Sequence, residues 1–269
     1  MADGVESLKL ESDPKGAGIS NPLDFTGTRS AVTGAAGGIG RAVAELLHER
    51  GSAVVACDLS GEALEPLAAA GLETVAADLG TAEGRAAFAG AAGPCDHLVV
   101  AHGIVRPKPI AETTEDDWDA IMGVNGKAVY FLCQAFGPLL RDGGAVVTVS
   151  SISARNAASQ EQSVYCASKA AVSSITRSFA HAYAPRGIRV NTVLPGIVDT
   201  PMQERFLAAA AAARGTTAEA LHAARLGQVP LGRTSPPEEC AETIVWLLSP
   251  AAGYLTGQQI AADGGLTMV

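Results

Sequence analysis

The stretch Thr33-Gly34-Ala35-Ala36-Gly37-Gly38-Ile39-Gly40 joins two segments of different periodicity. The residues before it, 29–33, form a short run that predicts a strand, whereas 39–50 repeats its apolar residues at helical spacing. Glycines at such a junction let the backbone turn tightly from a strand into a helix. The stretch therefore predicts the first strand-turn-helix unit of an α/β fold.

Outward from this unit, predicted strands alternate with predicted helices to the end of the chain. The strands lack polar alternation, as is typical of strands buried on both faces of a parallel sheet. The pattern predicts an α/β, doubly wound sheet with right-handed crossovers and helices on both faces. The predicted strands are 29–33, 52–57, 72–76, 97–101, 144–149, 188–193 and 258–262, and the longer helices are 39–50, 115–122, 124–140, 163–184 and 237–248.

Composition sets broad limits on the class of protein. The chain has 269 residues, a size compatible with one domain over 25–269, after a polar, flexible or surface-draped extension at 1–24. A net charge of −9 argues against a nucleic-acid or anionic-membrane surface. No segment is apolar and long enough for a signal peptide or a membrane span. Five scattered cysteines, without a Cys-x-x-Cys pair, predict reduced thiols, a cytoplasmic location and no dedicated metal site.

The glycine turn and the acidic residue at the next strand end predict a dinucleotide site. Glycines let the backbone approach a pyrophosphate, and the following helix N-terminus favours its negative charge. The spacing Gly-x-x-x-Gly-x-Gly meets the general fingerprint only in part, and a plain tight turn has the same composition. Asp58 can accept hydrogen bonds from an adenosine ribose and repel a 2′-phosphate, which favours NAD over NADP. Arg41 lies near enough to soften that exclusion or only to pair locally.

Tyr165 and Lys169 lie four residues apart on a predicted helix and so share one face. A phenol has an ordinary pKa of about 10, and a neighbouring cation favours its ionised form. The pair therefore predicts a proton-exchanging tyrosine whose pKa is lowered by lysine. Of the serines that follow the strand at 144–149, Ser150, Ser151 or Ser153 can bond a substrate oxygen, or simply cap a turn.

Other polar positions near the strand ends admit two interpretations each. Asn125 is a poor helix former in a predicted helix, so it either distorts the helix and holds a water or faces solvent. Asp78 either bonds an adenine amine or caps a helix. Thr200 either contacts the cofactor or, like Asp199, caps the next helix, and Gly196 allows close approach to nicotinamide. His102 and Cys166 are interpreted as packing residues, since no partner is evident in the pattern.

These motifs in this order resemble the short-chain dehydrogenase/reductase family over about 25–265. The resemblance implies a seven-stranded Rossmann sheet, Tyr165 as acid/base, Lys169 lowering its pKa and holding the nicotinamide ribose, and Ser151 polarising the substrate oxygen. It also assigns Asn125 to a proton relay through a water. The implied dinucleotide contacts are Gly34, Gly38, Ile39, Gly40, Asp58, Leu59, Asp78, Leu79, Gly103, Tyr165, Lys169, Pro195, Gly196, Val198 and Thr200.

The chain departs from the family pattern in two places. Val100-Ala101-His102-Gly103 stands where the family usually has Asn-Asn-Ala-Gly, so the contacts of the missing amide must be made otherwise. Ser151 also lies one residue further from Tyr165 than is commonest, which implies one inserted residue between them.

The expected function is NAD(H)-dependent interconversion of a secondary alcohol and its ketone. A rival is an NADPH-dependent 3-oxoacyl-thioester reductase, and a different class is a dinucleotide-binding sensor without turnover. Residues 197–229 are expected to form a substrate lid, with Met202, Phe206 and Leu207 as an apolar wall and Gln203 and Arg205 as polar contacts. Arg106, Arg155 and Arg205 are either carboxylate partners or surface residues. A homotetramer is implied by the resemblance, with the apolar stripe of 237–248 serving both core and interface.

Overall fold

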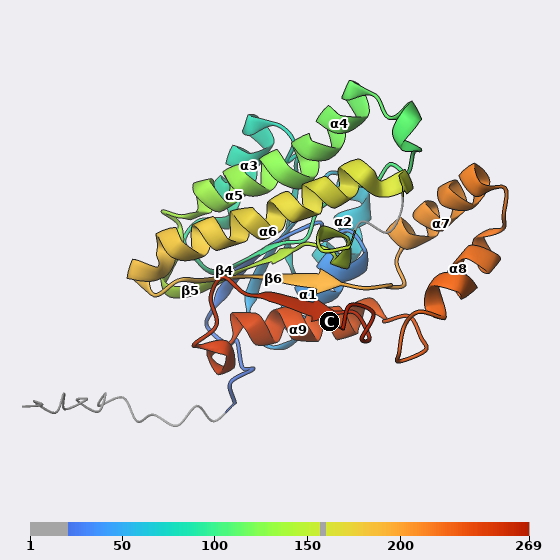
Figure 1. The fold of residues 1–269 in the computed structure, drawn as a ribbon. Helices are drawn as coiled ribbons and strands as arrows, with labels where there is room; N and C mark the ends of the chain where they lie inside the picture. The colour runs from blue at the N-terminus through green and yellow to red at the C-terminus, as the bar shows by residue number, and fades with distance from the viewer. Residues whose placement is uncertain (1–20, 157–159, 269) are drawn as a thin grey trace, which may run out of the picture.

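The computed structural model describes residues 21–156 and 160–268. Most of the N-terminal extension predicted at 1–24, namely residues 1–20, therefore lies outside the described residues. The described chain forms one α/β domain around a seven-stranded sheet with strand order β3-β2-β1-β4-β5-β6-β7, and every adjacent pair is parallel (Figure 1). The strands are β1 (Arg29–Thr33), β2 (Ala53–Asp58), β3 (Glu73–Ala76), β4 (Cys95–Val100), β5 (Leu140–Val149), β6 (Arg189–Pro195) and β7 (Gln259–Ala262). The predicted doubly wound fold is confirmed.

Helices cover both faces of the sheet. α1 and α9 lie on one face, and α5 and α6 lie on the other (Figure 1). The α-helices are α1 (Gly38–Glu49), α2 (Gly61–Ala69), α3 (Ala82–Ala92), α4 (Glu115–Met122), α5 (Ala128–Phe136), α6 (Ser163–Tyr183), α7 (Pro201–Arg214), α8 (Ala218–Leu226) and α9 (Pro237–Leu248). Short helical turns lie at Ile110–Glu112, Gly123–Lys127, Ile152–Ala154, Gln160–Gln162, Ala184–Arg186 and Pro250–Ala252.

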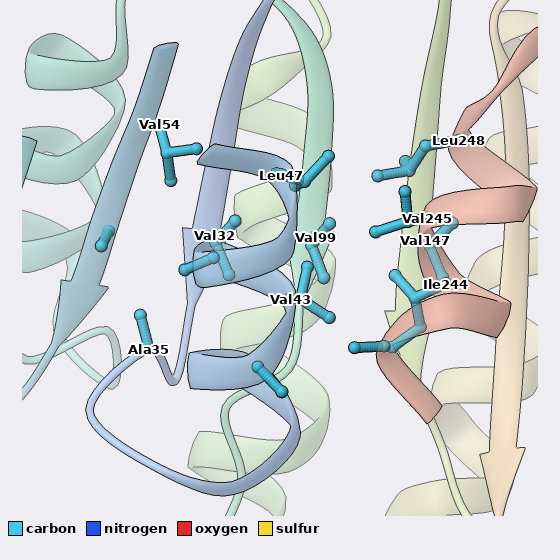
Figure 2. Packing of buried hydrophobic residues seen from close by; sticks show 14 of the residues in the cluster. Val32, Ala35, Val43, Leu47, Val54, Val99, Val147, Ile244, Val245 and Leu248 are labelled. Atoms are coloured by element: carbon cyan, nitrogen blue, oxygen red, sulfur yellow. The ribbon is translucent and has the colours of Figure 1, made fainter. Parts of the chain in front are cut away.

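The two layers of core follow from the alternation of side chains along each strand. On β1, Val32 packs on the α1/α9 side and Ala31 on the α5/α6 side. Figure 2 shows the first layer, where Val32 and Val99 of the sheet meet Val43 and Leu47 of α1. Because both faces of each central strand are covered, nearly every strand residue must be apolar. This explains the continuous apolar runs in the sequence.

The predicted helix at 124–140 is wrong at its C-terminal end. Its first residues form the π-helical turn Gly123–Lys127, which continues into α5, but α5 ends at Phe136 and Leu140 already belongs to β5. Gly137-Pro138 follows the helix, and proline has no N–H to continue the helical hydrogen bonds. By contrast, α4 and α9 have the predicted bounds.

The apolar stripe of α9 is fully used within the subunit. Ala241, Ile244, Val245, Leu247 and Leu248 are at most 2% exposed. Ile244, Val245 and Leu248 are seen in Figure 2 facing the sheet. In the single chain these five side chains serve the core, whereas Trp246 on the same helix is exposed, and the interface expected of this helix stays a prediction. Within residues 21–156 and 160–268, no helix combines the length and apolarity needed to cross a membrane.

Candidate active site

A cavity of about 600 Å³ opens at the carboxyl ends of the central strands. This is the edge at which open parallel sheets bind ligands, on either side of the β1/β4 switch point. All the predicted dinucleotide-contact residues line it, together with Ser151. Asn125 does not line the cavity. It lies behind Gly103, where a methyl group on Gly103 would come within 3.2 Å of the Asn125 Oδ1. The fold thus brings the predicted site residues to one place.

The glycine turn forms the floor of the cavity below α1. Gly34 has a φ of +69°, and a Cβ on Gly40 would lie 2.2 Å from the Gly34 carbonyl oxygen. Both positions therefore exclude other residues. Helix α1 begins without a side-chain cap or an acidic residue in its first turn, so its N–H groups remain available to an anion. These features fit a dinucleotide pyrophosphate.

Asp58 ends β2 beside that turn. One of its oxygens accepts the Ala36 N–H at 3.0 Å and the other accepts the Leu59 N–H at 2.7 Å. The two bonds hold the carboxylate at the cavity wall, where it fits the hydroxyls of an adenosine ribose. Arg41 pairs with Glu45 at 2.8 Å and is not among the residues that line the cavity.

Asp78 lies in the loop after β3, where its hydrogen bonds show whether it caps the following helix. Its Oδ1 accepts the Gly80 N–H at 2.9 Å, whereas Thr81 caps α3 by accepting the Gly84 N–H. Asp78 is therefore a turn residue and does not cap the helix. The buried Arg85 fixes this loop by donating to the carbonyls of Leu79 and Gly80.

On α6 Lys169 is buried and Tyr165 is half-buried, with the Lys169 ammonium 5.6 Å from the centre of the Tyr165 ring. Lys169 Nζ donates to the Val149 carbonyl at 2.9 Å. Burial raises the pKa of Tyr165 to about 12, opposed by a hydrogen bond with Ser151, and burial lowers the pKa of Lys169 to about 8. Burial is thus the largest influence on the pKa of the phenol, and the hydrogen bond with Ser151 is the contact that lowers it. The lowering of the Tyr165 pKa by Lys169 stays a prediction.

The three serines after β5 have separate partners. Ser150 donates to the Lys169 carbonyl at 2.7 Å, Ser151 bonds Tyr165, and Ser153 bonds the thiol of Cys166. Of the three, Ser151 alone pairs with the phenol. Sequence spacing could not show which of the three serines pairs with Tyr165, because the direction of each hydroxyl depends on the turn Ile152–Ala154.

Asn125 lies in the π-helical turn and is fully buried. Its side-chain oxygen accepts the Ile104 N–H at 2.8 Å, and its amide donates to the Ile104 carbonyl and to Ser168 Oγ. The solvent-facing alternative is therefore excluded, and the predicted helix distortion is present. The side chain links the loop after β4 to the residue preceding Lys169.

His102 and Cys166 were both expected to lack polar partners, and both have them. His102 lines the cavity, with Nδ1 2.8 Å from Thr33 Oγ1 and Nε2 3.2 Å from the Val124 carbonyl. Burial, with a contribution from the nearby Lys169 charge, lowers the pKa of His102 to about 4. Its position directly after β4 was the signal that could have marked it.

The segment after β6 connects the cavity to the predicted lid. Thr200 caps α7 by accepting the Gln203 N–H, and its methyl group lies 3.1 Å from where a Cβ on Gly38 would be. Asp199 is therefore not the cap. At Gly196 a Cβ would lie 2.7 Å from Asp263 Cα, so this glycine is required by packing against the chain after β7.

The lid segment forms the hairpin of α7 and α8. Met202, Gln203 and Arg205 line the cavity, as predicted. Phe206 and Leu207 do not; they pack inside the hairpin with Leu221. The predicted apolar wall is therefore wrong for these two residues, which face the lid's own core. Arg106 and Arg155 are absent from the cavity lining, and Arg155 donates to the Gln259 carbonyl.

In the described part of the chain, no group of three or more His, Cys, Asp or Glu side chains has the arrangement to hold a metal ion.

The chain is similar to known reductases and dehydrogenases. A family model described as "Enoyl-(Acyl carrier protein) reductase" matches residues 34–267. A 3-oxoacyl-[acyl-carrier-protein] reductase of Thermotoga maritima is 36% identical, covering 88% of this chain and 96% of its own length. A D-threitol dehydrogenase of Mycolicibacterium smegmatis is 34% identical, covering 93% and 97%.

Solved structures agree with this grouping. A short-chain dehydrogenase/reductase (glucose/ribitol dehydrogenase) from Brucella melitensis has a TM-score of 0.83 and 34% identity, covering 91% of this chain and 99% of its own. A metagenomic blue fluorescent protein, solved in complex with NADPH, has a TM-score of 0.81 and 27% identity, covering 91% and 100%.

Proposed function

Because this chain belongs to the short-chain dehydrogenase/reductase family of oxidoreductases, we propose that it interconverts a secondary alcohol and its ketone with NAD(H). The observation that carries the proposal is the set of Ser151, Tyr165 and Lys169 at one wall of the cavity, with Ser151 and Lys169 buried and Tyr165 half-buried. A protein that only senses a dinucleotide has no need for a phenol placed between a hydroxyl and a buried ammonium.

A nicotinamide cofactor held in this cavity would provide the hydride chemistry at the carbinol carbon. In the oxidation, Tyr165 takes the alcohol proton on its phenol oxygen, and Ser151 Oγ bonds the same substrate oxygen and stabilises its developing charge. Lys169 stabilises the ionised phenol and holds the nicotinamide ribose. Asn125, through its backbone carbonyl, positions a water that passes the proton outward. In the reduction these roles run in reverse.

Asp58 supports NAD as the cofactor. Its carboxylate is held at the cavity wall by two backbone N–H groups, and a 2′-phosphate placed there would meet a fixed negative charge. Among the described lining residues, the side chains that carry positive charge are Lys169 and Arg205. Lys169 lies in the Tyr165 cluster, and Arg205 comes from the lid.

The lid supports a small, polar substrate. The Gln203 amide nitrogen is buried and has no hydrogen-bond partner within the described residues, and Gln203 lines the cavity next to Met202. A buried donor without a partner is costly, so a substrate hydroxyl or carbonyl in reach of it gains affinity. Two relatives are named for such substrates, D-threitol dehydrogenase and L-xylulose reductase.

A 3-oxoacyl-thioester reductase using NADPH is the second candidate, because two relatives are named 3-oxoacyl-[acyl-carrier-protein] reductases. A panel of polyols, cyclic alcohols, hydroxy acids, steroids and 3-oxoacyl thioesters, assayed with both cofactors by absorbance of the reduced form, separates the two. Turnover of a secondary alcohol with NAD supports the first proposal. Turnover confined to thioesters with NADPH contradicts it.

Replacing Asp58 tests the cofactor assignment. Asp58→Ser removes the charge and should narrow the NAD-over-NADP ratio in kcat/KM by about ten- to hundredfold, because like-charge contacts cost several kcal/mol. Asp78→Ser is the matched control, since Asp78 lies in the neighbouring loop and should affect both cofactors alike. An unchanged ratio in Asp58→Ser would reject the assignment.

We further propose a cytoplasmic homotetramer. All five cysteines are free and buried, as suits a reducing compartment. Large apolar side chains exposed on the described surface, including Trp118, Tyr130 and Tyr254, offer contact areas outside the α9 stripe. Sedimentation of the full chain as a monomer at micromolar concentration would contradict the tetramer.

A further inference from the structure

His102 stands in the Val100-Ala101-His102-Gly103 segment, which departs from the family pattern. Its ring spans from the end of β1 to the π-helical turn Gly123–Lys127, with Thr33 Oγ1 on one side and the Val124 carbonyl on the other. No other side chain of the described chain is bonded to Val124. In this segment an imidazole therefore bridges two elements.

The partners of the ring define its tautomer. The Val124 carbonyl can only accept a hydrogen bond, so Nε2 carries the proton and donates to it at 3.2 Å. Nδ1 is then an acceptor, and Thr33 Oγ1 donates to it at 2.8 Å. Thr33 Oγ1 in turn accepts the Ala101 N–H at 3.1 Å and the His102 N–H at 3.4 Å, and it lies 3.4 Å from the Val99 carbonyl, a longer contact than the one with Nδ1. The neutral ring is thus held at both nitrogens.

The Val124 carbonyl needs this donor because of the π-helical turn. In a regular α-helix it would accept the N–H of residue 128. Here the Ala128 N–H is bonded to Gly123 instead. The turn therefore deprives Val124 of its ordinary partner, and His102 occupies that position. A π-helical turn is costly for a chain to maintain unless such groups are satisfied.

The next residue along the turn is Asn125, whose side chain holds Ile104 and Ser168. Ser168 Oγ donates to the Tyr165 carbonyl at 2.7 Å, and Lys169 follows Ser168 on α6. A displaced π-helical turn would therefore move Asn125 relative to both Tyr165 and Lys169. The route runs through hydrogen bonds of the described residues, each within 3.2 Å.

We propose that His102 is a positioning residue. It anchors the π-helical turn through Val124, and thereby sets Asn125 for the proton relay that the proposed function requires. The effect on the relay rests on that proposed function, but the anchoring itself does not.

Two substitutions of His102 separate its two bonds. Gln reaches about as far as Nε2 and can still donate to Val124, whereas Asn reaches only to the position of Nδ1. His102→Asn should lower kcat about tenfold while KM for NAD changes less than about twofold, because a misplaced relay slows chemistry without weakening binding. His102→Gln should keep kcat within about threefold of the unchanged protein.

His97→Asn is the matched control for loss of a buried imidazole. His97 lies on β4, the strand that precedes His102, with Nδ1 3.1 Å from Ser30 Oγ and its ring against Phe25, and it does not line the cavity. It should leave kcat unchanged. If His102→Gln loses as much activity as His102→Asn, or if His102→Asn keeps full kcat, the positioning role is wrong.

Hydrogen exchange of the full-length protein tests the anchoring without turnover. In His102→Asn, amides of the peptide covering 122–129 should exchange about three- to tenfold faster, while His102→Gln and His97→Asn match the unchanged protein. Equal exchange in all four proteins would overturn the anchoring. If exchange behaves as expected but the unchanged protein oxidises no alcohol with either cofactor, the proposed function fails and the anchor stands.

Discussion

Lys169 places a positive charge in a nearly solvent-free position beside the phenol of Tyr165. Burial acts on the two groups in opposite senses: it lowers the pKa of Lys169 to about 8 and raises that of Tyr165 to about 12. Both shifts disfavour the charged form of the group. Ionising either residue in this site therefore costs free energy, because little water is present to solvate the charge. The hydrogen bond of Ser151 to Tyr165 and that of Lys169 to the Val149 carbonyl partly offset this cost.

The buried Lys169 predicts a pH-dependent stability. Its pKa is lower in the folded chain (about 8) than its ordinary value of 10.5. Between these values the unfolded chain binds more protons, so the free energy of unfolding should rise with pH from about 8 towards 10. Below pH 8 the destabilisation by the buried charge is fully present, and it amounts to at most about 3 kcal/mol.

Thermal unfolding of the unchanged protein and of Lys169→Met measures this effect. The stability of the unchanged protein relative to Lys169→Met should increase between pH 7.5 and 9.5. Tyr165 begins to act in the other sense only above its ordinary value of about 10. A difference that stays constant over this range would show that Lys169 keeps an ordinary pKa.

At the scale of elements, helix ends are fixed by side chains remote in sequence. Arg189 on β6 donates to the carbonyls of Leu247 and Leu248 at the end of α9, and to Ser249 and Ala252 just beyond it. These carbonyls lack intrahelical partners, so the guanidinium satisfies the end of the helix. Helix α9 contributes much of the core seen in Figure 2. Its attachment to β6 therefore matters for the whole domain.

Arg189→Lys should destabilise the protein by about 2–3 kcal/mol, because one ammonium cannot replace four planar N–H contacts in a partly buried place. Denaturant unfolding measures the change. Arg177→Lys is the control, since Arg177 is exposed on α6, and it should shift stability by less than about 0.5 kcal/mol. Equal effects of the two substitutions would contradict the capping role.

At the scale of the whole molecule, the sheet and its ligand edge could be predicted from the sequence. Continuous apolar strands and intervening helices require a parallel sheet, and parallel strands bring their carboxyl ends to one edge. That is why residues as distant as Asp58, Ser151 and Thr200 could be placed around one cavity. The glycine turn was the strongest local signal, because its φ of +69° at Gly34 requires glycine.

The features that could not be predicted depend on contacts between elements. The bonds that Asn125 and His102 make, and the inward direction of Phe206, arise from packing that local pattern does not encode. The pKa of Tyr165 could not be predicted from local pattern either. The spacing of Tyr165 and Lys169 indicates that they share a helix face, but it does not show how far the phenol is removed from water, and that burial is the largest influence on its pKa.

The central claim is that Tyr165 exchanges a proton with an alcohol beside bound NAD. The most direct test compares the unchanged protein with Tyr165→Phe, measuring kcat on the best alcohol of the panel and NADH affinity by fluorescence titration. The account predicts that kcat falls by about 10²–10⁴-fold while the Kd for NADH stays within about threefold. A Phe variant that retains a tenth or more of the activity would contradict it.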